Sequence, residues 1–499
     1  MVPHTIGSTG SHGCREICRA HRDPPPRRSR SARGRSALQH PFPEGSVTAL
    51  DSESSIFEGD PMSRKFPKPP TPCMEVTNGN WQKSVGSWSY QNMDKILSTE
   101  PIPRIHDDSD VASLPDADWV DRDEILDLEV TLKNNERYTV RKIIDATDTD
   151  GWIVLRDNKV VIEQYFGTMA EDTRHILMSV TKPLTATVAG ILMEQEKMTT
   201  RGEYMLEPDK KVNDYVPELG GPNSGYKGAT VQTVLDMRSA VKFSEDYLDP
   251  TSEVREMDGA SGWAPRPSDQ SPTAVKQFLS NMKLASDPKR IPGCFEYRSC
   301  ETYVIGWVCE AAYKIARGTD MSFAQIASQL LWSKLGAQHD AYITVDEEDT
   351  GGFDGGICAT LRDLARYGAM ICGGGKSLRG HRVVSQRWVD DVFKGGDAQA
   401  FADGPRYNEL DMPGGKFHNM FWSPSSDRNV VIGIGIHGQM LYINKATGTV
   451  GVKLSSWALP EEAWKGGWKG FSALSIFQEI DTHLTRSAAS KISAGVAGR

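Results

Sequence analysis

The sequence predicts an α+β fold in which one antiparallel sheet is flanked by helices and a mostly helical lobe is inserted between its strands. Two β-rich runs, at 152–156 and 159–165, open the clearly ordered part of the chain. Three more, at 429–436, 440–444 and 449–456, stand near its end. The long segment between these groups has helical periodicity. Strands from both ends therefore pair in one sheet, and the helices between them form a second lobe.

Turn and capping residues separate these elements. Asp157-Asn158, between the two early runs, is typical of a tight β-hairpin turn. Helical periodicity occurs in four middle segments, at 231–237, 273–282, 302–316 and 323–335. Thr360-Leu361-Arg362-Asp363 predicts a capping box, and Ser385 predicts the cap of another helix that ends near Phe393. A last helix is expected at about 470–486.

The chain divides into a body and two tails. Residues 1–85 form a predicted disordered N-terminal tail, which is rich in arginine and proline and has too few apolar residues to build a core. The body spans 86–486, with its helical lobe at about 216–340, and 487–499 is a second disordered tail. The N-terminal tail lacks the apolar stretch of a secretory signal, so we expect a cytoplasmic location. Organelle import through the arginine-rich tail and a start at Met62 remain alternatives.

The composition argues against several classes of function. Of 499 residues, 38% are hydrophobic, which is enough for a sizeable core, and the net charge of −9 is spread along the chain. This balance argues against a nucleic-acid partner, and no apolar run is long enough to span a membrane. The eight cysteines form no disulfide framework, and Cys14-x3-Cys18 lacks the second pair of a zinc site. We therefore expect no metal and a small-molecule substrate; the oligomeric state stays open, a homodimer being one alternative.

The stretch Met178-Ser179-Val180-Thr181-Lys182-Pro183 carries the chemistry. Its Ser-x-x-Lys spacing places a hydroxyl and an amine on one helix face, which is one way to activate a serine for acyl transfer. The same spacing occurs at four other places: Ser224/Lys227, Ser239/Lys242, Ser280/Lys283 and Ser286/Lys289. Only Ser179 begins a long apolar helix, predicted to end near Lys197, and Pro183 is tolerated in its first turn. The positive end of that helix then lies beside the serine oxygen.

Several blocks in the same order extend this motif to a family resemblance. They are RHILMSVTK at 174–182, EDYLDP at 245–250, FEYRS at 295–299, GIGIHGQ at 433–439 and VKLSSW at 452–457. With the early hairpin and the three late strands, they resemble the serine β-lactamase and penicillin-binding-protein fold. Within it they closely resemble the nylon-oligomer hydrolases that cleave the 6-aminohexanoate dimer, whose relatives are class C β-lactamase-like carboxylesterases. The resemblance covers roughly 145–486 and implies a mechanism without metal or cofactor.

By this resemblance, three side chains carry the reaction. Ser179 is the nucleophile that forms an acyl-enzyme, Lys182 holds or shuttles the proton, and Tyr297 is the general base and then the acid. The backbone amides of Ser179 and Ile436 form the oxyanion hole. A phenol with a pKa near about 10 is a poor base, so we expect the Lys182 ammonium to lower the pKa of Tyr297.

The resemblance also implies a substrate pocket. It places six residues there: Tyr247, Asp258, Trp263, Asp354, Trp422 and His437. Tyr247 matches the tyrosine that closes over an amide substrate, and Asp258 matches a carboxylate that faces the terminal amine of the substrate. Asp354 is a looser match, because its glycine-rich loop differs in length. Each residue has a structural alternative, as a packed aromatic or histidine side chain or as a surface carboxylate.

Two departures argue against activity on β-lactams. Tyr297-Arg298-Ser299 replaces a Tyr-x-Asn motif, and Ile436-His437-Gly438 replaces a Lys-Thr-Gly strand, so the lysine that would bind a β-lactam carboxylate is missing. The predicted function is a serine hydrolase, an amidase or carboxylesterase that acts on a linear amide or a small ester. An acyltransferase that uses the same acyl-enzyme and a non-catalytic binding protein remain the alternatives.

Overall fold

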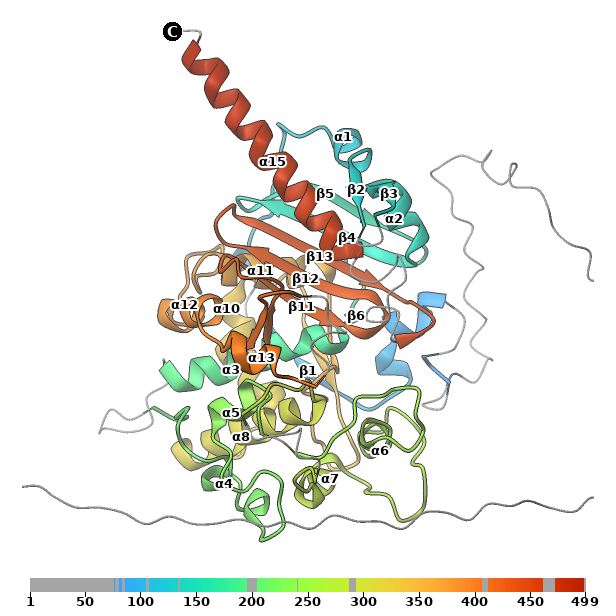
Figure 1. Cartoon of the computed structure of the whole chain (residues 1–499), viewed down its shortest axis with the longest axis vertical. Helices are drawn as coiled ribbons and strands as arrows, with labels where there is room; N and C mark the ends of the chain where they lie inside the picture. Colours follow the sequence, from blue (N-terminus) through green and yellow to red (C-terminus); the bar gives the residue numbers. More distant parts are fainter. Residues whose placement is uncertain are drawn as a thin grey trace, which may run out of the picture. The chain divides into compact units, whose positions relative to one another are not determined.

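The main sheet of the computed structural model combines strands from both ends of the chain, as the sequence predicts (Figure 1). The structure describes residues 76, 80–82, 86–104, 107–132, 135–194, 204–239, 241–286, 293–405, 412–460 and 472–497. Across the sheet the strands are β5 (Lys159–Tyr165), β4 (Thr149–Arg156), β13 (Thr449–Ser455), β12 (Gln439–Asn444), β11 (Val430–Gly435), β10 (Phe421–Ser423) and β9 (Lys416–His418). All neighbouring strands are antiparallel.

The early hairpin forms as predicted. Strands β4 and β5 are joined by Asp157 and Asn158, whose φ angles of 50° and 64° are both left-handed. Two such residues make the turn whose twist matches that of paired strands. The predicted strands at 429–436, 440–444 and 449–456 are also confirmed, as β11, β12 and β13.

Helices cover both faces of the sheet. Gly368, in α11 (Leu361–Cys372), lies against Leu441 and Val450. On the other face Phe477, in α15 (Ser472–Ala497), packs on Tyr442, with ring centroids 5.8 Å apart. Because successive residues of a strand point to opposite faces, Leu441 and Tyr442 settle which helix covers which side. Figure 1 shows α11 and α15 on opposite sides of the strands.

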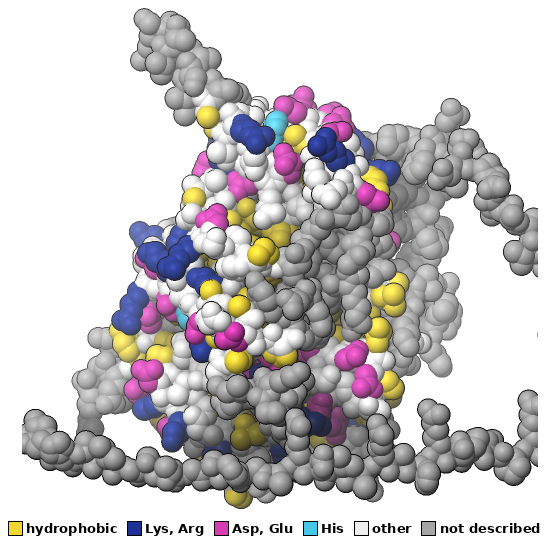
Figure 2. Space-filling view, in the orientation of Figure 1, with side chains coloured by type: hydrophobic (Ala, Val, Ile, Leu, Met, Phe, Trp, Pro, Cys, Tyr) yellow, Lys and Arg dark blue, Asp and Glu magenta, His cyan; other side chains and the backbone are white. Residues whose placement is uncertain are grey.

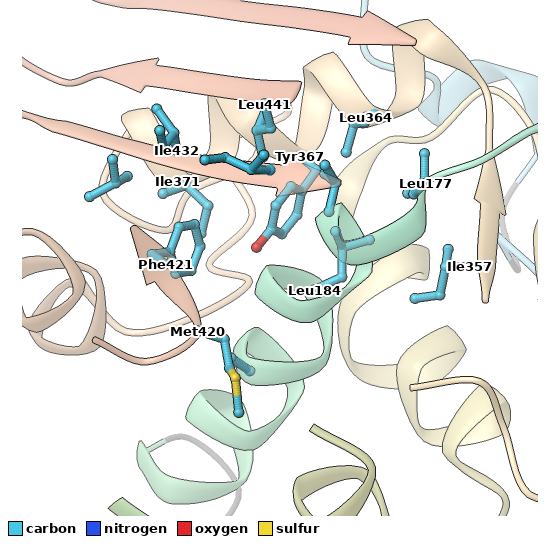
Figure 3. Packing of buried hydrophobic residues seen from close by; sticks show 14 of the residues in the cluster. Leu177, Leu184, Ile357, Leu364, Tyr367, Ile371, Met420, Phe421, Ile432 and Leu441 are labelled. Carbon is cyan, nitrogen blue, oxygen red and sulfur yellow. The ribbon is translucent and has the colours of Figure 1, made fainter. Parts of the chain in front are cut away.

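The helix that carries Ser179 lies in the core, on the side of the main sheet that α11 covers. It begins with the 3₁₀ turn η4 (Met178–Val180) and continues as α3 (Thr181–Glu194), where every residue from Thr181 to Met193 is buried. Figure 3 shows Leu184 of this helix beside Tyr367 of α11 and near Leu441 of the sheet. The predicted start near Ser179 is confirmed, whereas the predicted end near Lys197 lies outside the described residues.

The middle of the chain is helical, as predicted. Its elements are α4 (Val212–Tyr215), η5 (Pro217–Gly220), α5 (Val231–Leu235), α6 (Glu253–Ala260), α7 (Val275–Asn281), α8 (Ser299–Arg317), α9 (Phe323–Ala327), η6 (Ser328–Trp332) and α10 (Ser333–Leu335). The predicted helix at 323–335 is interrupted, because η6 is a π turn between α9 and α10. Then come α12 (Gln386–Lys394), which Ser385 caps as predicted, and α13 (Ala398–Ala402).

Short elements escaped the sequence prediction, because strands of two to four residues carry no readable periodicity. A second sheet has the order β1 (Thr99–Ile102), β7 (Ala341–Thr344), β8 (Ile357–Ala359) and β6 (His175–Ile176). A third pairs β2 (Glu129–Thr131) with β3 (Arg137–Thr139). The remaining early elements are η1 (Gly86–Gln91), η2 (Met93–Lys95), η3 (Asp108–Asp110), α1 (Arg122–Leu126) and α2 (Val140–Ala146).

The predicted capping box of α11 is half right. Thr360 Oγ1 accepts a hydrogen bond from the amide of Asp363, as expected. The carboxylate of Asp363 instead accepts from the amides of Gln338 and His339, at 2.7 and 3.0 Å, and pairs with Arg366. The acidic residue therefore ties α11 to the chain before β7 rather than closing the box.

Both predicted tails are shorter than expected. Trp81 lies inside the predicted N-terminal tail, yet it is buried and donates its indole N–H to the carbonyl of Trp263. Helix α15 continues to Ala497, so most of the predicted C-terminal tail at 487–499 is helical. Among the described residues, no helix has both the length and the apolar character needed to cross a bilayer. Acidic and basic side chains are interspersed on the described surface in Figure 2.

A buried imidazolium links the lobe to the main sheet. Nδ1 of His418, at the end of β9, lies 2.8 Å from Asp236, and Nε2 lies 2.8 Å from Asp391 of α12. Burial lowers the pKa of His418, but hydrogen bonds to the two carboxylates outweigh this effect and raise it to about 9. The charged form therefore bridges three segments that are far apart in the sequence.

We expect this bridge to make stability fall in alkaline solution. Since the folded pKa of His418 lies above its ordinary value of 6.5, the stabilisation is complete below that pH and is lost as the pH rises through about 9. The loss is about 3 kcal/mol, measured as the free energy of unfolding in urea between pH 6 and pH 10. His418→Asn should be less stable at pH 6 and should lose this component of the pH dependence. An unchanged alkaline slope in that variant would contradict the assignment.

Candidate active site

Ser179 and Lys182 meet at the start of the buried helix. Lys182 Nζ donates to Ser179 Oγ at 2.9 Å, and both side chains are buried. Met178, just before the serine, has a φ of +46°, an uncommon left-handed conformation for a residue other than glycine. The chain therefore turns sharply at Met178 and presents Ser179 at the positive end of the helix.

The loop between β7 and β8 supplies the second contact of Lys182. Nζ donates to the carbonyl of Asp354 at 2.9 Å and lies 3.7 Å from its carboxylate. One turn along α3, Thr185 Oγ1 donates to the carbonyl of Phe353 at 2.7 Å. The Phe353 ring lies directly over Gly306 of α8, where an added Cβ would come within 2.1 Å of the ring. The loop is therefore held between two helices, with Asp354 on the lysine.

Tyr297 completes the cluster from the segment just before α8. Lys182 Nζ lies 5.2 Å from the centroid of its ring, and the Ser179 and Lys182 side chains lie near enough to its hydroxyl to lower the pKa of the phenol. Trp422 of β10 stacks on the same ring, with centroids 5.1 Å apart and planes 22° apart. The structure therefore brings Ser179, Lys182 and Tyr297 together as predicted, and Trp422 orients the phenol from behind.

Lys182 lowers the pKa of Tyr297, as expected, but burial outweighs this effect. Burial raises the pKa of Tyr297, the Lys182 charge lowers it, and the Glu245 charge raises it again, so that the pKa lies above its ordinary value. Burial lowers the pKa of Lys182, but its interactions with Tyr297, Asp354 and Glu245 outweigh this and raise it. The resting pair is therefore an ammonium beside a neutral phenol, and its protons are coupled.

Glu245 is a site residue that the sequence analysis did not single out. Its carboxylate accepts hydrogen bonds from the hydroxyl of Tyr247 at 2.8 Å, from the amide of Ser299 at 3.0 Å and from the hydroxyl of Ser299 at 2.5 Å. It sits at the N-terminus of α8, where a negative charge is favoured. The sequence carries one signal for Glu245, which is a carboxylate two residues before the expected pocket tyrosine, Tyr247.

The replaced Tyr-x-Asn motif has a structural explanation. Ser299, in place of the asparagine, binds Glu245. The central Arg298 is buried and forms ion pairs with Glu296 and, at 3.2 Å, with Glu301. A buried guanidinium between two carboxylates resists displacement, because either partner left alone would be an unpaired buried charge. Tyr297 is therefore anchored by the residues on both sides of it.

Asp258 and Trp263 lie on and just after α6. Asp258 is buried and pairs with Arg255 at 2.8 Å. Burial raises the pKa of Asp258 to about 7 despite Arg255, with help from the charges of Asp354 and Glu245. Trp263 donates to Thr344 Oγ1 at 3.1 Å, and its ring lies against Gly355, the residue after Asp354. Asp258 therefore belongs to the acidic side of the site, and Trp263 supports the loop that carries Asp354.

The strand expected to complete the oxyanion hole lies beside the nucleophile turn. Gly435, at the end of β11, approaches the carbonyl of Leu177 and the side chain of Met178 so closely that an added Cβ would come within 3.0 Å of both. Ile436 and His437 follow directly. His437 is buried, has a φ of +61°, and places Nδ1 2.6 Å from the carbonyl of Trp457. Burial lowers its pKa to about 4, so this imidazole is neutral near pH 7.

The predicted residues therefore fall into two groups. Ser179, Lys182, Tyr297 and Asp354 contact or interact with one another directly. Tyr247, Asp258, Trp263, Trp422 and His437 form a surrounding layer that contacts the first group or its supporting loops. Asp354, the looser match by sequence, is in direct contact with Lys182, whereas the His437 ring contacts Trp457 and Tyr90.

Comparisons with known proteins agree with this architecture. The sequence profile of the β-lactamase family matches residues 140–469. The 6-aminohexanoate-dimer hydrolase of Paenarthrobacter ureafaciens is 34% identical over 412 residues, which are 82% of this chain and 95% of that protein.

Two solved structures show the same fold. One, from Bacillus anthracis and provisionally named a 6-aminohexanoate-dimer hydrolase, has a TM-score of 0.69 and 24% identity over 83% of this chain and 98% of its own. The other, from Bacteroides dorei and provisionally named a β-lactamase, has a TM-score of 0.50 and 18% identity over 69% of this chain and 97% of its own. Profile, relative and fold agree, and the chain belongs to the β-lactamase family of hydrolases.

Proposed function

We propose that this protein is a serine hydrolase that cleaves a linear amide or a small carboxyl ester through an acyl-enzyme on Ser179. The observation that carries this function is the 2.9 Å contact of the buried Lys182 ammonium with Ser179 Oγ, next to the phenol of Tyr297. An isolated serine with a solvated lysine would show neither the burial nor the third partner.

The proposed reaction has two halves. In the first, Ser179 Oγ attacks the substrate carbonyl carbon while the Lys182–Tyr297 pair, after losing one proton, accepts the serine proton. Backbone amides of Ser179 and Ile436 stabilise the oxyanion. The tetrahedral intermediate collapses, the bond to the leaving amine or alcohol breaks, and Tyr297 protonates that group. In the second half, water gives a proton to Tyr297 and attacks the acyl carbon. The bond from that carbon to Ser179 Oγ then breaks, the carboxylic acid leaves, and Tyr297 returns the proton to Ser179 Oγ.

The relative from Paenarthrobacter suggests the substrate class. Its name describes hydrolysis of a linear amide dimer that ends in an amine. In this chain Asp258 lies near two other carboxylates of the site. The charges of Asp354 and Glu245 raise the pKa of Asp258. A substrate ammonium would relieve this repulsion, so the acidic side of the pocket supports an amine-terminated amide as substrate.

Labelling tests the nucleophile. The protein should react with a fluorophosphonate probe, and Ser179→Ala should lose both labelling and hydrolysis of p-nitrophenyl esters. Ser280→Ala is the matched control, since Ser280 shares the Ser-x-x-Lys spacing but hydrogen-bonds only to a helix carbonyl of α7 among the described residues. Labelling that persists in Ser179→Ala, or no labelling of the native protein, would refute the proposed function.

Glu245→Gln tests the coupled proton pair. The charge of Glu245 raises the pKa of both Lys182 and Tyr297, so its removal lowers both. The limb of the kcat/KM pH profile that reports this pair should move to lower pH, while Asp249→Asn, in the exposed part of the same loop, should leave it in place. A profile that stays fixed while activity falls would assign Glu245 to folding alone.

Asp258→Asn tests amine recognition. We expect kcat/KM for the aminohexanoate dimer to fall by about tenfold and that for a neutral p-nitrophenyl ester to change by less than about twofold. Asp269→Asn, an exposed carboxylate beyond the same helix, serves as control. Equal losses on both substrates would mean that Asp258 acts through its pair with Arg255 rather than through the substrate.

A further inference from the structure

A short N-terminal segment, which begins inside the predicted tail and continues into the predicted domain, packs beside the candidate active site. Trp81, Tyr90 and Met93 are fully buried, although 80–82 belongs to the stretch that the sequence predicts as disordered. They form a small apolar cluster separate from the main core, together with Ile176, Met178, Trp263, Cys358 and Ile436. Two members of this cluster, Met178 and Ile436, adjoin or form the proposed oxyanion hole.

Trp81 reaches the nucleophile side of the site through Trp263. Its indole N–H donates to the carbonyl of Trp263 at 2.8 Å, and the two rings meet edge to face with centroids 5.8 Å apart. The Trp263 ring in turn lies against Gly355, where an added Cβ would be 2.9 Å from the indole and 3.5 Å from the backbone of Met178. Trp81 thus supports the junction of the Asp354 loop and the turn before Ser179.

Tyr90 reaches the oxyanion side through His437. The two rings meet edge to face, with centroids 5.4 Å apart and planes 71° apart. His437 is the residue after Ile436, and its other edge is held by the carbonyl of Trp457. The hydroxyl of Ser89 donates to the carbonyl of Trp81 at 2.7 Å, which ties the two aromatic residues into one unit.

The backbone is strained at two residues beside these contacts, Met178 and His437. Met178 and His437 both have left-handed φ angles, of 46° and 61°, and neither is glycine. Each such residue costs of order 1–3 kcal/mol and persists only where the surroundings enforce it. Met178 precedes Ser179, and His437 follows Ile436, so both strained residues flank the amides proposed for the oxyanion hole. The packing of the N-terminal segment is placed to enforce both.

We propose that the segment comprising residues 80–82 and 86–93 braces the two halves of the oxyanion hole, with Trp81 and Tyr90 as positioning residues. This inference rests on the proposed function. Neither residue touches the reacting atoms; Trp81 acts through Trp263, and Tyr90 acts through His437. The expected signature is a loss of turnover with little change in substrate affinity, because the oxyanion develops only after binding.

Kinetics of point variants in the full chain test the brace. Trp81→Ala and Tyr90→Ala should lower kcat on a p-nitrophenyl ester by about tenfold or more, with KM within about twofold. Tyr90→Phe should keep native kcat, since the ring makes the contact and the buried hydroxyl has no hydrogen-bond partner among the described residues. Native kcat in both alanine variants, or equal losses in Tyr90→Phe and Tyr90→Ala, would overturn the proposal.

Hydrogen–deuterium exchange supplies a readout that does not depend on catalysis. Trp81→Ala should raise amide exchange over 177–182, and Tyr90→Ala should raise it over 435–438, while the far strand β5 exchanges as in the native protein. Uniformly faster exchange would mean general destabilisation and would overturn a local bracing role. If native protein escapes fluorophosphonate labelling, the proposed hydrolase fails; if it is labelled but neither kcat nor local exchange responds, only the brace fails.

Discussion

The buried ammonium of Lys182 is the feature on which the rest of the site depends. A charge out of water costs several kcal/mol unless other groups compensate it. Here the compensation comes from Ser179 Oγ, the Asp354 carbonyl and the nearby carboxylates of Asp354 and Glu245. These partners lie on η4, on the β7–β8 loop and on the loop before α6. The nucleophile is therefore positioned by the same packing of these segments that compensates the Lys182 charge.

Aromatic side chains fix the positions of the groups that surround Lys182. Trp422 stacks on Tyr297 from the main sheet, and Trp263 lies against the Asp354 loop. The same packing excludes water, and this raises the pKa values of Tyr297, Asp258 and Asp354 above their ordinary values. The titrations of these groups are therefore coupled, and a change in bound charge shifts the protonation of the whole cluster.

The two departures from the β-lactamase pattern both change the charges around the site. Ser299 stands where a Tyr-x-Asn motif has its amide, and the charge it binds, Glu245, interacts with Lys182. His437, just after β11, lies in the block expected to match the Lys-Thr-Gly strand, and it is neutral and buried. With acidic side chains on the pocket side, the electrostatics favour a cationic end of a substrate over an anionic one.

The sequence by itself determined the elements whose signal lies within a few residues. These are the Asp157-Asn158 turn, the three late strands, and the start of the helix that carries Ser179 and Lys182. Turn residues and hydrophobic periodicity are local properties, so they can be recognised in the sequence without knowledge of the fold. Only the tertiary structure decided that the charge of Glu245 acts on Lys182, that Trp81 is buried and that the pKa of Tyr297 rises. Each depends on burial and on contacts between segments far apart in the chain, which no local pattern encodes.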